Sequence, residues 1–123
     1  MGKINNFYEL DAWKMGHLLV LEIYQITESF PKNEIYGITS QIRRAASSIT
    51  ANIAEGFARY HFKDKIRFYY NSRGSVAEVQ NFLFLARDLN HINIVSFKKI
   101  EERTNEVGKL INGLIRSTEN QLK

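Results

Sequence analysis

The sequence predicts an all-α protein, one domain over residues 1–123 folded as an antiparallel up-down-up-down four-helix bundle. Four segments place apolar residues at the three- and four-residue spacing of a helix face, and short polar turns separate them. No segment shows the apolar–polar alternation of a strand. The length of 123 residues suits one domain with its own hydrophobic core. We expect helices near residues 8–29, 38–59, 64–90 and 96–121, as in a bundle.

The first two expected helices meet at a break around Pro31, the only proline. Proline has no N–H and its ring clashes with the preceding turn, so it stops a helix. Before the break, apolar residues step along one helix face: Met15, Leu19, Ile23, Ile26 and Phe30. The stripe of the second helix mixes large and small residues, which predicts close packing against a neighbour: Ile38, Ile42, Ala45, Ala46, Ile49, Ile53 and Gly56.

The third expected helix is apolar on two sides. One side carries Phe68, Val79, Phe82, Ala86 and Leu89, and the other carries Ile66, Tyr70, Ala77 and Phe84. A helix of this kind lies between two partners, and in so small a chain we expect one of them to be another subunit. The turn HINIVS follows, with Ser96 as the expected N-cap of the fourth helix.

The fourth expected helix has one apolar stripe and one charged face. The stripe consists of Ile100, Thr104, Val107, Ile111, Leu114, Ile115 and Thr118. We expect the charged face to be solvated: Lys98, Glu102, Arg103, Glu106, Lys109 and Arg116.

The composition narrows the class of protein. A net charge of +4 is mildly basic and favours an acidic partner only weakly. The absence of cysteine excludes disulfides and thiol chemistry. The Met-Gly start resembles a myristoylation signal, but Asn6 stands where that signal needs Ser or Thr. Without a signal-peptide pattern or an apolar run of 18 residues, we expect a cytoplasmic protein that makes no contact with a membrane.

The sequence offers no strong catalytic or metal-binding pattern. His17, His61 and His91 lie in three separate segments. Asp88 and His91 have the spacing with which a bundle helix presents two ligands to a di-metal site. Such a site needs two of these motifs and two further glutamates, and this chain has one copy near a helix end. No Gly-rich phosphate loop or nucleophile motif is present. We therefore expect a non-enzymatic protein with no metal and no cofactor.

Polar residues run beside the apolar stripe of the second helix. Asn52 and Glu55 belong to this strip, and Glu78 lies on the third helix. A buried polar group without a partner costs about 1–3 kcal/mol. We therefore interpret Asn52, Glu55 and Glu78 as a structural network that joins the second helix to the third, or one subunit to the next. A functional pocket lined by Glu55 and Glu78 is the alternative.

The basic cluster between residues 43 and 73 is the strongest functional signal. Its seven cations outnumber two acidic residues: Arg43, Arg44, Arg59, Lys63, Lys65, Arg67 and Arg73. The centre, RYHFKDKIRFYY, interleaves the cations with aromatic residues. Cations neutralise phosphates and exposed rings stack on unpaired bases, so this pattern indicates a nucleic-acid surface. Alternatively, the rings are core or interface, the lysines keep a helix start soluble, and Arg43 and Arg44 belong to the polar network.

Several short motifs follow one another along the chain: FP at 30–31, GIT at 37–39, QIRRAA at 41–46, NIAEG at 52–56, and GS at 74–75 followed by Glu78. In this order they resemble the bacterial family of 23S ribosomal RNA intervening-sequence proteins, and the resemblance covers nearly the whole chain. It implies a four-helix bundle that assembles as a five-fold ring. The family name refers to the genomic location of the genes, so the resemblance says more about the fold than about the function.

Two functional hypotheses follow. The first is a non-enzymatic protein associated with RNA or the ribosome through the basic and aromatic surface. The alternative is a ring-shaped protein-interaction scaffold whose basic face meets an acidic protein, with no direct RNA binding. In both cases we expect a homo-oligomer, because the surplus apolar surface of the first and third helices would be wet in a monomer. The resemblance implies that this homo-oligomer is a pentamer.

Overall fold

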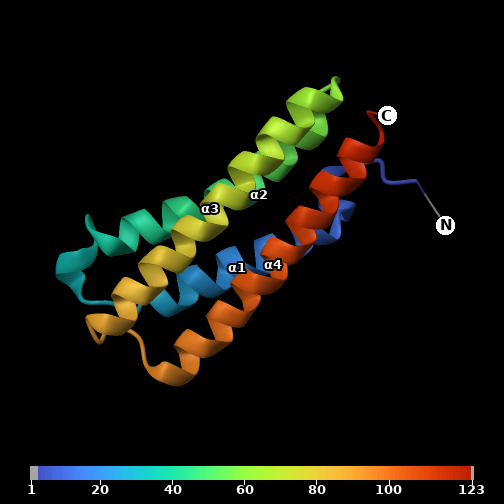
Figure 1. Ribbon diagram of the computed structural model, residues 1–123. Coiled ribbons are helices and arrows are strands. Elements are labelled where there is room, and N and C mark those ends of the chain that lie inside the picture. The colour runs from blue at the N-terminus through green and yellow to red at the C-terminus, as the bar shows by residue number, and fades with distance from the viewer. Residues whose placement is uncertain (1–2, 123) are drawn as a thin grey trace.

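The computed structural model describes residues 3–122, and most of them belong to four long helices (Figure 1). These are α1 (Asp11–Thr27), α2 (Ile38–Ala58), α3 (Phe62–Asp88) and α4 (Ile94–Asn120). The short 3₁₀ helices η1 (Phe7–Glu9) and η2 (Lys32–Glu34) precede α1 and α2. No strand occurs between residues 3 and 122, so the all-α prediction is confirmed.

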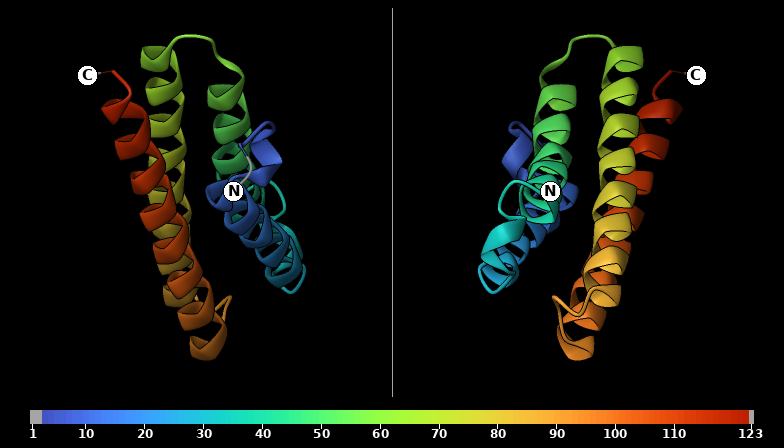
Figure 2. Two further views of the ribbon diagram at one scale, coloured as in Figure 1. Left: turned by 90° about the vertical axis from the view of Figure 1, so that its right-hand side faces the viewer. Right: turned by 90° about the vertical axis from the view of Figure 1, so that its left-hand side faces the viewer.

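Successive helices run in opposite directions, as the predicted up-down-up-down bundle requires (Figures 1 and 2). Each helix packs against two others: α1 against α2 and α4, and α3 against α2 and α4. The α1–α2 and α3–α4 connections lie at one end of the bundle, which we call the far end. The turn between α2 and α3 lies at the opposite end, beside the last turns of α4. None of the helices described here is long and apolar enough to cross a membrane.

The helix ends differ from the predicted ranges by at most three residues. The first helix begins at Asp11 because residues 7–9 form the separate turn η1, where the Glu9 carboxylate accepts a hydrogen bond from the Asn6 N–H at 3.0 Å. The prediction of Ser96 as an N-cap is wrong. Asn93 caps α4, and its side-chain oxygen accepts a hydrogen bond from the Ser96 N–H at 2.8 Å. Asn93 thereby satisfies one of the N–H groups that a first helical turn leaves unpaired.

The apolar stripes of α2 and α4 form the centre of the core, as predicted. All seven stripe residues of α2 are buried, and on α4 only Leu114 of the stripe is half-buried. Leu19 and Ile23 of α1 have no exposed surface and complete the core from the opposite side.

Small residues bring α2 and α3 into close contact. A Cβ atom on Gly56 would lie 2.7 Å from Cε1 of Tyr69, a distance that leaves no room for a methyl group. The fully buried Ser72 donates a hydrogen bond from Oγ to the carbonyl oxygen of Ile49 at 2.7 Å. The predicted close packing of the second helix is confirmed, because the two backbones approach each other where their side chains are short.

The helix α3 departs most from its prediction. Its buried residues are Tyr69, Ser72, Ser75, Val76, Val79, Leu83 and Ala86. Tyr70, Ala77, Phe84 and Leu89, which the sequence assigned to apolar faces, are exposed in the single chain. Val79 and Ala86 are buried as predicted, but the sequence did not predict that the close contact with α2 also buries Ser72 and Ser75. Whether a second subunit covers those side chains stays a prediction.

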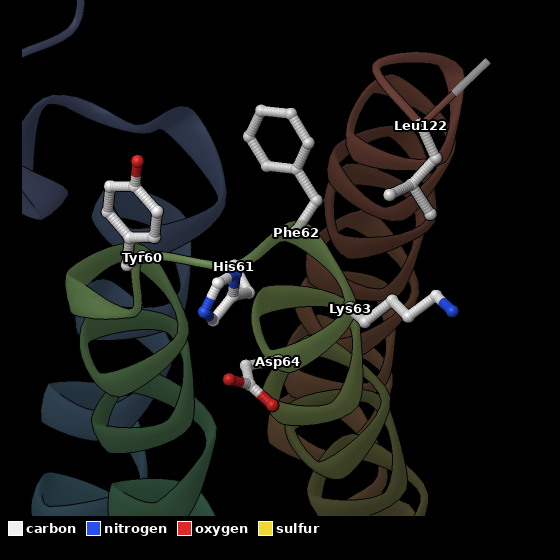
Figure 3. Close-up of a pocket in the computed structure, with 6 residues that line it drawn as sticks. All are labelled: Tyr60, His61, Phe62, Lys63, Asp64 and Leu122. Atoms are coloured by element: carbon white, nitrogen blue, oxygen red, sulfur yellow. The ribbon is translucent and has the colours of Figure 1, made fainter.

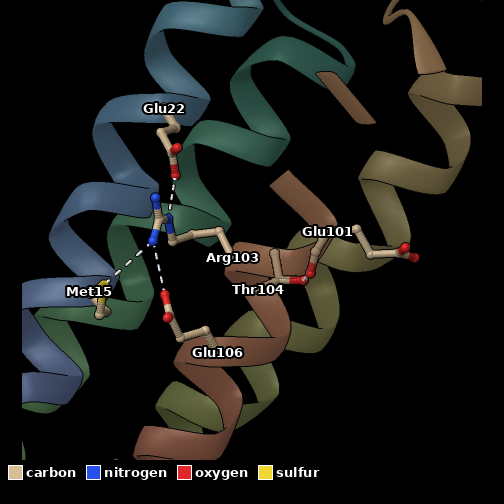
Figure 4. Close-up of polar contacts among 6 residues, drawn as sticks. All are labelled: Met15, Glu22, Glu101, Arg103, Thr104 and Glu106. Atoms are coloured by element: carbon tan, nitrogen blue, oxygen red, sulfur yellow. Dashed lines mark hydrogen bonds and ion pairs between the residues drawn. The ribbon is translucent and has the colours of Figure 1, made fainter. Parts of the chain in front are cut away.

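A cluster around Arg103 joins α4 to α1 (Figure 4). Its Nε donates a hydrogen bond to Glu22 at 3.0 Å, and its Nη1 donates to Glu106 at 2.9 Å. Nη1 also lies 3.7 Å from the sulfur of Met15. The hydrogen bonds to Glu22 and Glu106 raise the pKa of Arg103. The prediction that Arg103 belongs to a purely solvated face is wrong, since its guanidinium reaches across to α1.

Candidate nucleic-acid interface

Residues 59–61 connect the end of α2 to the start of α3, and the backbone is extended at Arg59 and His61. With the first turns of α3 they form what we call the tip, residues 59–68. The middle residue, Tyr60, is 89% exposed, and its ring meets the His61 ring edge to face at 5.0 Å. Figure 3 shows the rings of Tyr60 and Phe62 projecting beyond the helix ends on the same side. The tip therefore presents aromatic surface to solvent instead of burying it.

An open hollow of about 720 Å³ lies at the tip (Figure 3). Its lining residues come from the turn, the start of α3 and the end of the chain: Tyr60, His61, Phe62, Lys63, Asp64 and Leu122. The Lys63 side chain is exposed to solvent. The one carboxylate of the hollow, Asp64, lies 4.0 Å from Arg67, a weak contact at the surface.

Two arginines flank Phe68, one turn further along α3. The guanidinium carbons of Arg59 and Arg67 lie 4.6 and 4.5 Å from the centre of its ring. Arg59 also pairs with Glu55 at 3.1 Å, but both side chains are about half exposed. Exposed ion pairs of this kind contribute about 0–1 kcal/mol, so either arginine can exchange a carboxylate for a phosphate at little cost. Arg59, Lys63 and Arg67 thus form a group of accessible cations beside the half-buried Phe68 ring and the exposed Tyr60 ring.

Lys65 has a different role from the other cations of the tip. Its Nζ donates a hydrogen bond to the carbonyl oxygen of Phe57 at 2.7 Å and lies 5.2 Å from the centre of the Phe57 ring. This carbonyl belongs to the last turn of α2, where no further N–H of the helix is available. Burial lowers the pKa of Lys65. The structure therefore places Lys65 as a cap on α2 rather than among the accessible cations.

The remaining predicted cations lie along the bundle, away from the tip. Arg43 donates to Thr27 at 2.8 Å and lies over the Tyr24 ring, so it joins α2 to α1. Arg73 donates to Asn112 at 3.1 Å and so joins α3 to α4. Arg44 is exposed on α2. The structure therefore divides the basic cluster of the sequence into three accessible tip residues, three residues with structural contacts and one separate surface arginine.

The structure does not bring Asn52, Glu55 and Glu78 into one network within the chain. Asn52 donates to the carbonyl oxygen of Ser48 at 2.8 Å, and Ser48 Oγ in turn lies 3.0 Å from Ser75 Oγ on α3. Glu55 and Glu78 are both exposed. The predicted network is wrong for a single chain because both carboxylates face solvent, while serines make the buried contacts. The sequence signal that could have revealed these buried contacts was the presence of short side chains, such as Ser75, in the motifs. A role for Glu55 and Glu78 between subunits stays a prediction.

The histidines and acidic residues do not gather into a catalytic or metal-binding group. His17 stacks on Trp13 with ring centres 4.6 Å apart, and His61 lies at the tip. His91 lies in the connection between α3 and α4, at the far end. Asp88 pairs with Arg87 at 2.9 Å instead of facing His91. Within residues 3–122, no three His, Asp or Glu side chains lie close enough to hold a metal ion.

Comparisons with known proteins agree with the fold. A solved structure, described as a protein with unknown function from the S23 ribosomal protein family of Bacteroides thetaiotaomicron, superposes with a TM-score of 0.76. It is 20% identical and covers 85% of this chain and 97% of its own, so the likeness concerns the fold. No curated protein matches the sequence. The sequence model described as 23S rRNA-intervening sequence protein matches residues 8–113. The chain therefore belongs to the 23S rRNA-intervening sequence protein family.

Proposed function

We propose that this protein is a non-enzymatic, cytoplasmic RNA-associated protein that contacts single-stranded RNA through the tip. The observation that carries the proposal is the exposed ring of Tyr60 beside the accessible cations Arg59, Lys63 and Arg67. Unpaired bases stack on aromatic rings while cations track the phosphates, and this combination does not require a particular base sequence. Ribosomal RNA is the first RNA to test, because the family description refers to 23S rRNA.

The test is fluorescence anisotropy with a labelled single-stranded RNA. The double substitution Lys63→Glu/Arg67→Glu is expected to abolish binding, because it turns two attractive charges into repulsive ones. Tyr60→Ala is expected to weaken binding by about 1–3 kcal/mol, the contribution of one stacked base. Lys98→Glu is the matched control, since Lys98 is exposed on α4 near the far end. Equal weakening by the control and the tip variants would contradict the tip as the contact surface.

We also propose that the chain assembles as a homo-oligomer, with the number five taken from the family resemblance. The support is large apolar side chains at the surface of α1 and α3: Leu18, Leu21, Tyr24, Phe84 and Leu85. An assembly would cover part of this surface and repeat the tip, so that one RNA could contact several tips with increased avidity. Sedimentation should give about five times the chain mass of 14.3 kDa. A monomer at micromolar concentration would refute the proposal.

A protein-interaction scaffold is the second candidate, and the far end favours it. Tyr36 is 93% exposed and Val95 is 75% exposed, so this end offers exposed apolar side chains to a partner. A pull-down that captures a stoichiometric protein and no RNA supports the scaffold. An acidic partner surface would indicate binding at the tip, and an apolar partner surface would indicate binding at the far end. Recovery of RNA that the Lys63→Glu/Arg67→Glu variant loses supports the first proposal.

A further inference from the structure

A second hollow, of about 420 Å³, lies beside the tip. It is lined by residues from four segments: the N-terminal segment, the last turn of α2, the start of α3 and the last turns of α4. Its size falls in the range of about 300–1,000 Å³ that small-molecule sites occupy. Five side chains give it a mostly apolar wall: Ile4, Leu10, Phe57, Phe62 and Leu114.

Two polar groups of α3 line the same hollow, Lys65 and Tyr69. They are four residues apart, so they lie on one face of the helix. Tyr69 is only 2% exposed, and its hydroxyl makes no hydrogen bond to another residue between 3 and 122. Every side-chain oxygen or nitrogen that is sealed off in this part of the chain has a partner. The Tyr69 hydroxyl therefore borders the open space of the hollow, where a ligand or solvent can meet it.

The charges of the hollow have one sign. Lys3 and Lys65 line it, and the described lining residues include no carboxylate. Lys65 is half-buried, and this burial lowers the pKa of its ammonium group. Its one hydrogen-bond acceptor in the described chain, the Phe57 carbonyl, leaves two of three N–H groups available.

We propose that this hollow binds a single-chain amphiphile with an anionic head group. The head group accepts hydrogen bonds from the Lys65 ammonium and the Tyr69 hydroxyl. The hydrocarbon chain packs against the apolar wall, where Phe57 and Leu114 oppose each other from α2 and α4. Six of the eleven lining residues lie outside residues 8–113, so the matched family region contains only part of this site. The proposal is independent of the proposed RNA contact, which uses Arg59, Lys63 and Arg67.

The test is isothermal titration calorimetry of the full chain with octanoate, decanoate, decyl phosphate and decanol. Decanoate should bind saturably with one molecule per chain. Each methylene buried is worth about a fourfold gain, so decanoate should bind about fifteenfold more tightly than octanoate. Decanol, which has no charge, should bind at least about tenfold more weakly than decanoate. The relative affinities of decanoate and decyl phosphate decide whether the head group is a carboxylate or a phosphate.

The variant Tyr69→Phe removes only the hydroxyl and keeps the ring against Gly56. It should retain the circular dichroism of the wild type and its RNA binding, while its affinity for decanoate falls about tenfold. Lys65→Met, which keeps the aliphatic stem, should weaken decanoate more than decanol. Equal affinity for decanol and decanoate would overturn the proposal, as would unchanged decanoate binding in Tyr69→Phe. Displacement of decanoate by uridine monophosphate at lower concentration would also overturn it, because the hollow would then be a nucleotide site.

Discussion

Nε2 of His91, in the turn after α3, lies 2.8 Å from Oε2 of Glu34 in η2. The contact joins the α1–α2 and α3–α4 connections, which are 57 residues apart in the chain. Both side chains are largely buried, and the His91 ring lies 5.7 Å from the ring of Phe30. The far end of the bundle is therefore held together by a polar contact set against an aromatic ring.

Substitution His91→Ala should lower the free energy of unfolding by about 1–2 kcal/mol, because the Glu34 carboxylate loses a partner in a partly buried site. Urea unfolding measures the loss. In a double-mutant cycle, Glu34→Ala should have little further effect in the His91→Ala background. Additive losses in the cycle would show that the two side chains act independently.

Gly56→Ala should destabilise the protein by about 1–3 kcal/mol, because the added methyl group would lie 2.7 Å from Cε1 of the buried Tyr69 ring and force the ring or the helices to shift. Gly74→Ala is the matched control on a helix. A Cβ atom at Gly74 meets no atom within 4 Å, so this change should stabilise the helix by about 0.5–1 kcal/mol. Thermal unfolding of both variants tests these opposite effects on stability. A gain in stability for both would mean that α2 and α3 can move apart without a loss of stability.

Burial raises the pKa of Tyr69 to about 12, from an ordinary value of 10.0. Above the ordinary value, the unfolded chain releases this proton while the folded chain keeps it. Stability is therefore unaffected by Tyr69 below about pH 10 and falls as the pH rises toward about 12, by roughly 2–3 kcal/mol in total. Tyr69→Phe has no such proton, so unfolding measured at about pH 9 and pH 11.5 should show a smaller decline than in the wild type. Parallel declines would show that burial does not raise the pKa of Tyr69.

The proposed RNA contact predicts a specific salt dependence. For a single-stranded RNA, log affinity should fall linearly with log salt, with a slope of about −0.7 for each phosphate contact. Lys63→Gln should flatten the slope by about that amount, because it removes one released counterion. Arg73→Gln should leave the slope unchanged, since the Arg73 guanidinium is held by Asn112. If both substitutions flatten the slope equally, Arg73 also contacts the RNA and the RNA surface extends along α3.

The stripes of α2 and α4 were predictable because large apolar residues recur there with a helical period and all point to one core. The buried face of α3 was not predictable, because it includes Ser72 and Ser75. A search for regularly spaced apolar residues assigns serines to the surface. Serine is buried on this face of α3 only because the Ile49 carbonyl and the Ser48 hydroxyl lie opposite. Such partners exist only after α2 and α3 have packed.

The same limit applies to charge. The sequence grouped Arg59, Lys63 and Arg67 with four other cations, and these three lie together at the tip because they are near neighbours along the chain. The sequence could not distinguish Lys65 from these cations, because Lys65 donates its hydrogen bond to the Phe57 carbonyl oxygen at the end of α2. A helix-end carbonyl leaves no signal in the amino-acid sequence. Likewise, the role of Arg103 depends on Glu22, which is 81 residues away in the chain.

The close packing of α2 and α3 has a consequence for molecular recognition. The three residues 59–61 span two long helices whose backbones are fixed against each other at Gly56 and Ser72. A turn this short has few alternative conformations, so most of its conformational entropy is lost when the helical hairpin forms. A ligand that meets Tyr60 then orders only side chains, and each immobilised side chain costs about 0.5–1.5 kcal/mol. Lengthening the turn with glycines should therefore weaken binding at the tip through entropy alone, with every contacting residue still present.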